Sequence, residues 1–188
     1  MHTSWLAALC LLLATAAPAH PYRVDDMLAL QSYGQVTVDS TGRWAAIERR
    51  DRYDVAPRYS YDYFVRRQLS KLRLLDLERG GPLRPLIDDE ADAGDWAGGF
   101  SPDGRRLALF RLRQDRLALG IVDIASRAVD WLDVTPDLPD ARPAPIWLDD
   151  DHLLVVALPD GGLPDLLANP SNAQRLAGAA WPVAATGR

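Results

Sequence analysis

The sequence predicts an all-β protein, a partial β-propeller of about three to four blades with PD40/WD40-like repeats and a short C-terminal helical segment. The first observation is a repeated turn. Val38–Ile47 and Gly99–Phe110 both pass through a polar turn that ends on Gly into a basic residue and an apolar strand, and Ile146–Val156 is a degraded copy. The second observation is a repeated apolar strand, Leu72–Leu77 and Leu119–Ile124. Units of about 40 to 50 residues built from short strands and polar turns are typical of propeller blades.

The two repeated features share one period. The strand repeats after 47 residues, from Asp76 to Asp123, and the turn repeats after the same 47 residues, from Phe100 to Trp147. The first two turns are 62 residues apart, so the first unit contains an insertion. The alternative is an ordinary meander sandwich in which the similarity is accidental.

The strands that follow the turns have the apolar patterns expected of strands that pack against other sheets. In the second unit, Ala108, Phe110 and Leu112 lie on one face of a strand and Arg residues lie on the other. In the third unit, Leu153–Leu158 is apolar on both faces, which suits a strand between packed sheets. Three tryptophans at blade positions are expected in the core, namely Trp96, Trp131 and Trp147.

The first 19 residues have the features of a secretory signal peptide. Leu6–Ala14 is an unbroken apolar run, too short to span a bilayer, and Ala17-Pro18-Ala19 offers small residues for cleavage. The sequence therefore predicts an exported protein, periplasmic or secreted, with no membrane span after cleavage. The alternative is a buried N-terminal helix. The predicted organisation is a signal peptide at 1–19, a lead-in segment at 20–35, an incomplete ring of blades at 36–162, and a loop with a short helix at 163–188, where the protein is truncated.

The composition excludes several classes of protein. With 48% hydrophobic and 25% charged residues in 188, the chain is a soluble globular protein, and its net charge of -5 gives no reason to expect a nucleic acid partner. Arg supplies nearly all basic residues, which indicates coding bias. Cys10 is the one cysteine, so an intramolecular disulfide and a Cys-rich zinc site are excluded. No cofactor and no metal are predicted, and the acidic runs Asp88–Asp92 and Asp149–Asp151 are expected to be solvated loops.

Five segments carry a resemblance to a known family. Ser101–Arg105 and Asp26–Leu30 resemble the recurrent turn and the propeller start of prolyl oligopeptidase-type (S9) serine peptidases. Tyr33–Val36, Ile47–Arg50 and Tyr53–Tyr59 are similar to the start of the lasso-peptide isopeptidases, exported members that open the isopeptide ring of lasso peptides. The resemblance implies the N-terminal propeller portion of such a peptidase, with a lasso peptide as the substrate partner.

The catalytic parts of that family are not present in the sequence. Members have a propeller of about seven or eight blades and then an α/β-hydrolase domain with a Ser, an Asp and a His. Gly99–Gly104 is the nearest approach to a nucleophile elbow, but Pro102 lacks the N–H that the residue after the nucleophile must donate. We therefore predict no catalytic residue and expect this chain to be inactive alone. The alternative function is a stand-alone periplasmic propeller-like binding protein without enzymatic activity.

The insertion in the first unit is the strongest candidate for a binding function. Residues 49–67 contain six Arg and five aromatic residues, and Tyr and Arg are enriched at binding hot spots. The resemblance implies that propeller loops select and orient the peptide. The predicted substrate-binding residues are Arg52, Tyr53, Arg58, Tyr59 and Tyr61. The alternative is an elongated hairpin whose Tyr side chains pack with neighbouring Arg side chains.

Overall fold

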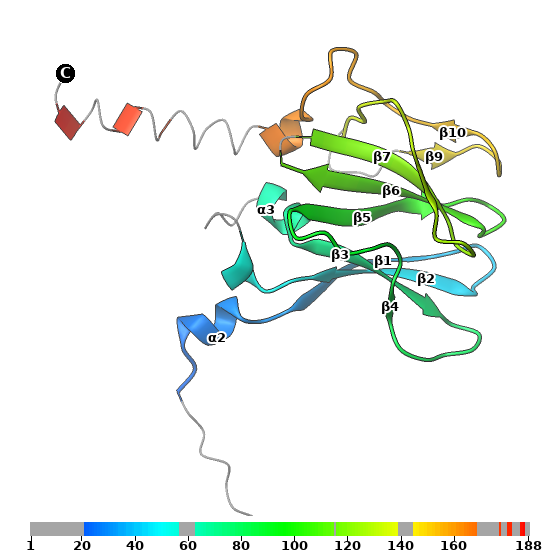
Figure 1. The fold of residues 1–188 in the computed structure, drawn as a ribbon, viewed down its shortest axis with the longest axis horizontal. Helices are drawn as coiled ribbons and strands as arrows, with labels where there is room; N and C mark the ends of the chain where they lie inside the picture. The colour runs from blue at the N-terminus through cyan, green and yellow to red at the C-terminus, as the bar shows by residue number, and fades with distance from the viewer. Residues whose placement is uncertain are drawn as a thin grey trace, which may run out of the picture.

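The computed structural model describes residues 21–56, 63–114, 116–138 and 145–168, together with residues 177, 180, 181, 185 and 186. This part of the chain is all-β, with several antiparallel sheets and a few short helices (Figure 1). None of its helices has the length and apolar character that crossing a membrane requires. The predicted signal peptide lies outside the described residues.

The first sheet is a four-stranded antiparallel meander whose strands follow one another in chain order. Its strands are β1 (Ser32–Val38), β2 (Trp44–Arg50), β3 (Ser70–Asp76) and β4 (Arg84–Pro85). Gly42, with φ at +74°, closes the turn between β1 and β2 in the left-handed conformation that Gly adopts without a steric penalty. Helix α2 (Val24–Leu28) precedes β1, and Asp26 caps it by accepting the N–H of Arg23 at 2.8 Å.

The second sheet repeats this arrangement. Its strands are β5 (Ala93–Phe100), β6 (Arg106–Arg113), β7 (Arg116–Asp123) and β8 (Val129–Trp131). Gly104, with φ at +70°, closes the turn between β5 and β6 as Gly42 does in the first sheet. A two-stranded hairpin follows, made of β9 (Ile146–Trp147) and β10 (Leu153–Leu154). Each of the three repeated turns therefore joins two antiparallel strands, as the sequence predicts.

Consecutive repeats contact one another through their turns. The Ser40 hydroxyl donates to the carbonyl oxygen of Pro102, 62 residues away. The backbone N–H of Asp103 donates to the carboxylate of Asp150 at 2.8 Å, 47 residues away. These separations equal the two spacings in the sequence, so the sequence period is also a spatial period.

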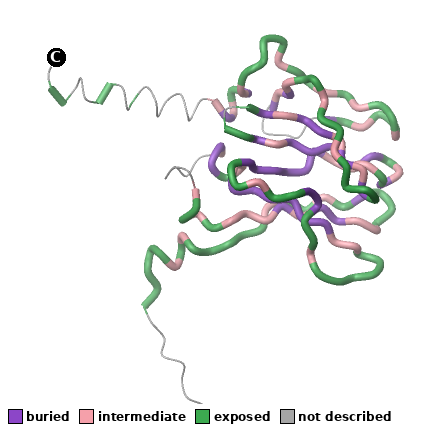
Figure 2. The backbone as a smooth tube through the Cα atoms, viewed as in Figure 1, coloured by how far each residue is buried: buried purple, intermediate pink, exposed green. Residues whose placement is uncertain are grey.

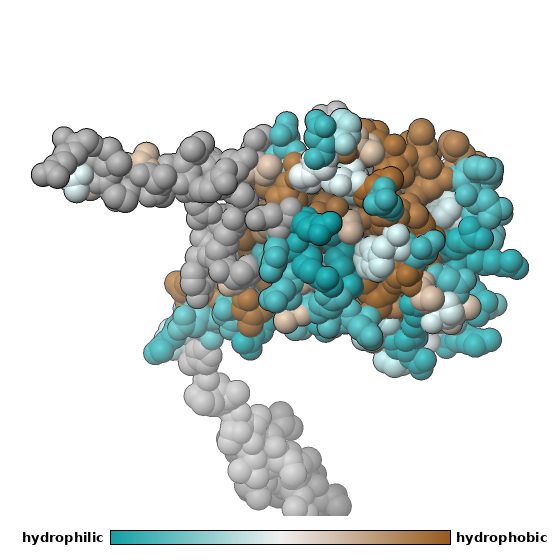
Figure 3. Space-filling view, turned by 45° about the horizontal axis from the view of Figure 1, so that its top comes forward, coloured by the Kyte–Doolittle hydropathy of each residue, from teal (hydrophilic) through white to brown (hydrophobic). Residues whose placement is uncertain are grey.

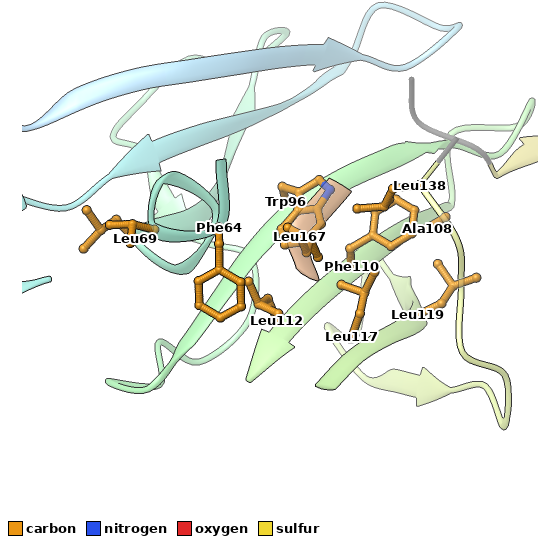
Figure 4. Close-up of a cluster of buried hydrophobic side chains, with 11 residues drawn as sticks. Phe64, Leu69, Trp96, Ala108, Phe110, Leu112, Leu117, Leu119, Leu138 and Leu167 are labelled. Carbon is orange, nitrogen blue, oxygen red and sulfur yellow. The ribbon is translucent and has the colours of Figure 1, made fainter. Parts of the chain in front are cut away.

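Two hydrophobic clusters share the second sheet. One joins the first sheet to the second and includes Leu72 of β3 and Leu109 of β6. The other lies on the opposite face of the second sheet and includes Phe64, Trp96 and Phe110 (Figure 4). The rings of Trp96 and Phe110 stack there, with centroids 5.4 Å apart. Buried residues therefore concentrate on the central strands, and exposed residues lie on the turns and outer elements (Figure 2).

Two expectations about apolar residues are wrong. Of Leu153–Leu158, only the first two residues form strand β10, and Leu154 and Val156 are 54% and 46% exposed because no described element covers that face. Hydrophobic atoms consequently gather on the surface on the β9 and β10 side of the molecule (Figure 3). Trp131 is 40% exposed because β8 is the outer strand of its sheet, and its ring covers the Arg111 guanidinium at 5.1 Å.

The described part of the insertion after β2 is helical and does not form a hairpin. It forms a 3-10 helix, η1 (Tyr53–Val55), and an α-helix, α3 (Tyr63–Gln68), which buries Phe64 and Val65. Helix α3 approaches β5 closely because Gly94 has no side chain, and a Cβ atom at that position would overlap the α3 backbone.

The helical turn that ends at residue 168 also packs on the core. A helical turn at 165–168 buries Leu167 in the cluster that contains Trp96 (Figure 4). The rest of the predicted loop and short helix at 163–188 lies largely outside the described residues.

Candidate functional site

The chain between β2 and β3 returns to the first sheet beside a buried carboxylate, that of Glu48. This residue is 1% exposed. Its oxygens accept hydrogen bonds from the Ser70 hydroxyl at 2.5 Å, the Gln35 N–H at 3.1 Å, Arg50 Nε at 3.1 Å and Arg67 Nη1 at 3.2 Å. We call these five residues the Glu48 centre. Because the donors come from the first hairpin and from the end of the insertion, the centre fixes the insertion to the sheet.

A β-bulge in β1 makes room for this carboxylate. Tyr33 pairs with Arg49 and Val36 pairs with Ile47, so the two residues between them on β1 oppose Glu48 alone. A Cβ atom on the first of these two, Gly34, would lie 2.6 Å from the Glu48 carboxylate. The two sequence segments 33–36 and 47–50 therefore form one structural unit.

The Glu48 centre keeps its carboxylate ionised. Burial raises the pKa of Glu48, but the hydrogen bond from Ser70 and the charges of Arg67 and Arg50 outweigh this effect. The pKa of Glu48 consequently lies below its ordinary value of 4.5. The single negative charge of Glu48 neutralises only one of the two guanidinium groups that contact it. The Glu48 centre, which forms the base of the insertion, therefore keeps a net positive charge.

Arg67 connects the Glu48 centre to the hydrophobic core. Its guanidinium lies 4.8 Å from the centroid of the Tyr63 ring and 4.9 Å from that of the Trp96 ring. Both distances are within the range of cation–π attraction. With its side chain only 14% exposed, Arg67 holds α3 against β5 and the first sheet together.

The predicted substrate-binding residues divide into three groups. Arg52 is exposed and forms an ion pair with Asp54 at 2.8 Å. Tyr53 is half-buried and packs against the core cluster that contains Phe64. The other three predicted residues lie outside the described residues, and they are Arg58, Tyr59 and Tyr61.

The Ser of the segment Gly99–Gly104 and the one His among the described residues have structural roles. The hydroxyl of Ser101 is buried, donates to the Asp103 carboxylate at 2.7 Å and accepts the N–H of Arg106 at 3.0 Å. It therefore closes the turn between β5 and β6. His152 lies in the turn between β9 and β10, where its Nδ1 lies 2.9 Å from the Asp149 carboxylate.

The acidic run after β4 is an ion-paired connection, which corrects the expectation of a solvated loop. The guanidinium of Arg73 binds the Asp89 carboxylate through two hydrogen bonds of 2.7 and 2.6 Å. The Lys71 ammonium group, 5% exposed, donates to the carbonyl oxygens of Glu90 and Ala93. Buried cations on β3 thus hold the segment that links the two sheets. In the sequence, the signal for this role is the alternation of basic residues with leucines in residues 71–74.

The sequence gives little indication of the Glu48 centre. A Glu within an apolar strand and next to two Arg residues is typical of a solvent-facing position. The single local signal is Gly34, since an isolated Gly within a strand pattern indicates a bulge or a close backbone approach.

Comparisons with known proteins give a likeness in structure only. No protein-family model matches the sequence, and no curated protein is similar to it. Among solved structures, the apo form of the isopeptidase AtxE2 is similar, with a TM-score of 0.49, 15% identity, 87% of this chain covered and 26% of that chain covered. A prolyl endopeptidase, from a study of inter-domain dynamics in two such enzymes, is similar with a TM-score of 0.32 and 10% identity over 68% of this chain and 29% of that chain. The chain therefore spans between a quarter and a third of the length of these two solved structures.

Proposed function

We propose that this chain is an N-terminal propeller portion of an exported prolyl oligopeptidase-type serine peptidase that opens lasso peptides. In this role its sheets are blades that restrict access to a catalytic domain and orient the peptide. The observation that carries the proposal is the hydrogen bond between Asp103 and Asp150, because it joins equivalent positions of successive repeats. Blades that follow one another around a ring meet in this way.

The substrate-facing part of the proposal is the insertion. Its base is fixed by the Glu48 centre and by the packing of Arg67 between two rings. A fixed base lowers the entropy that is lost when a loop orders around a ligand. Arg52 and Tyr53 come shortly after β2. The exposed guanidinium of Arg52, which pairs with Asp54, would exchange this partner for a peptide carbonyl or carboxylate.

The segments that resemble lasso-peptide isopeptidases in sequence are the ones that form the base of the insertion. Residues 33–36 and 47–50, which are similar to lasso-peptide isopeptidases, form the bulge and the strand that surround Glu48. We propose that this arrangement presents the insertion to a threaded peptide, whose ring is too bulky for an ordinary extended-peptide groove.

Binding of a labelled lasso peptide to the purified full-length chain tests the proposal, with fluorescence anisotropy as the readout. We expect the threaded peptide to bind more tightly than its unthreaded branched-cyclic isomer of identical composition. The substitution Arg52→Ala should weaken binding by about tenfold, as expected for loss of one charge-assisted contact. The matched control is Arg116→Ala, at an exposed position on β7.

Three results would contradict the proposal. These are equal binding of the two isomers, an equal loss of binding in both Arg variants, and covalent labelling of a Ser by a fluorophosphonate probe. Equal binding of the isomers by a monodisperse chain that unfolds cooperatively in urea would favour the stand-alone binding protein.

A further inference from the structure

A cleft of about 690 Å³ lies between the first and second sheets. The turns around it are at the end of the sheets opposite α3 (Figure 1). The turns that connect β1 to β2, β3 to β4, β5 to β6 and β7 to β8 line it. Each turn or its flank contributes Arg to the lining, which contains Arg43, Arg79, Arg84, Arg105 and Arg127. Trp44 and Ile124 add apolar surface. Its size lies within the range of small-molecule sites, roughly 300 to 1,000 Å³.

The carboxylates that line this cleft accept hydrogen bonds from backbone N–H groups of their own turns. Asp39 accepts the N–H groups of Thr41 and Trp44, at 3.1 and 2.6 Å. The other three lining carboxylates make the same kind of backbone contact, and they belong to Asp76, Asp103 and Asp123. Their oxygens are therefore engaged mainly by the turns. Among the described residues, only two long ion pairs join them to guanidinium groups of the cleft, Arg43 to Asp76 at 3.9 Å and Arg105 to Asp103 at 3.7 Å.

The guanidinium groups have few partners of their own. Within the described chain, Arg79, Arg84 and Arg127 make no side-chain hydrogen bond or ion pair. The buried Nε of Arg43 has no hydrogen-bond partner, and its nearest carboxylate, that of Glu78, is 3.7 Å away. The ion pairs of Arg43 with Glu78 and Asp76 are longer than a hydrogen bond, so the exposed part of its guanidinium can still donate to an anion in the cleft.

Arg127 also occupies a conformation that favours Gly. Its φ is +62°, in the left-handed region, and its N–H donates to the carbonyl oxygen of Asp123 at 2.7 Å. The equivalent position in the first sheet, 47 residues earlier, is Gly80, with φ at +68° and the same contact to Asp76 at 2.8 Å. Arg127 therefore adopts a left-handed conformation that costs Arg energy, whereas the equivalent turn of the first sheet has Gly, which adopts it without strain. The strain is consistent with a functional requirement for a cation at this point.

We propose that this cleft binds a small molecule that carries two or more oxyanion groups, either carboxylates or phosphates. Guanidinium groups recognise both by paired N–H donors. Several such groups on one compact ligand would engage the Arg side chains from both sheets. Because the whole chain has a net charge of -5, general attraction of anions to the protein does not account for such binding. This site lies at the other end of the sheets from the insertion, so the inference does not depend on the proposed function.

Isothermal titration calorimetry of the full-length chain at low ionic strength tests this inference, with citrate and pyrophosphate as separate probes. We expect at least one of them to bind, and the tighter probe identifies the oxyanion as carboxylate or phosphate. Arg127→Gly should weaken binding by about tenfold or more, the loss expected for one charge-assisted pair. Its melting temperature should not fall, because Gly removes the left-handed strain.

Arg66→Gln and Arg116→Gln are the matched controls, since each removes one exposed positive charge outside the cleft. Arg84→Gln gives a second cleft variant that does not alter a turn with positive φ. Failure of both probes to bind would overturn the inference. An equal loss of affinity in the controls and in the cleft variants would do the same, because it would show a general effect of charge.

Discussion

The backbone N–H of Asp103 donates to the carboxylate of Asp150, and the two residues are one repeat of 47 positions apart. Asp150→Ala removes this acceptor, and we expect it to lower the free energy of unfolding by about 1 kcal/mol, the usual net contribution of such a bond. Urea denaturation measures the change. Asp160→Ala removes an exposed Asp from the loop after β10 and should have no effect. Equal stability of the two variants would mean that the contact between turns does not stabilise the fold.

The Glu48 centre should make stability depend on pH. The pKa of Glu48 is lowered in the folded chain, so its stabilisation is present above the ordinary value of 4.5 and is lost as the pH falls through the lowered folded value. Glu48→Gln should lower the free energy of unfolding by roughly 3 kcal/mol at neutral pH, because two Arg side chains lose a buried partner. The difference from the unsubstituted chain should shrink below pH 4.5. Glu78→Gln, at a 71% exposed side chain, is the control and should show neither effect.

Two tryptophans differ in burial, so their replacement by Ala should lower the free energy of unfolding by very different amounts. Trp96 is 3% exposed and stacks on Phe110, so Trp96→Ala should destabilise the fold by about 3 to 5 kcal/mol. Trp131 is 40% exposed and mainly covers Arg111, so Trp131→Ala should remove only about 1 kcal/mol. Urea denaturation of both variants compares them directly. Similar losses would show that the outer strand β8 is buried in solution.

Helix α3 should detach from β5 when the space at Gly94 is filled. A Cβ atom there would overlap the backbone of α3, which must then move away. Gly94→Ala should therefore speed amide hydrogen exchange in residues 63–69, and leave exchange in β7 close to that of the unsubstituted chain. Unchanged exchange in α3 would contradict the close packing of the helix on the strand.

The apolar surface beside β9 and β10 should cause association of the purified chain. The exposed residues of this hairpin and its flanks are Ile146, Leu148, Leu154 and Val156. Leu154→Lys should reduce concentration-dependent light scattering without lowering the melting temperature, because the side chain is already 54% exposed. Scattering that persists unchanged would assign the association to another surface.

Much of the fold could be predicted from local pattern. Gly42 and Gly104 both stand where the chain needs a positive φ, and their shared position predicted two turns that the structure contains. The 47-residue spacing reappears as a contact between turns. These features depend on a few neighbouring residues, which is why a sequence period reveals them.

The insertion and the Glu48 centre depend on contacts between distant segments. Tyr63–Gln68 is too short to show a helical period, and it is helical because Phe64 and Val65 reach the core of the second sheet. Glu48 is buried because Gly34, Arg67 and Ser70 converge on it from outside its own strand. Local polarity predicts exposure at such a position, and only tertiary packing reverses it.

The two faces of strand β6 belong to different hydrophobic clusters, and this affects how the protein unfolds. Leu109 belongs to the cluster shared with the first sheet, whereas its neighbour Phe110 belongs to the cluster that holds α3 and the C-terminal segment. Loss of either cluster would expose one side of the same central strand and weaken the remaining one. The two sheets should therefore melt in a single transition, and damage at the insertion should also weaken the packing between the two sheets.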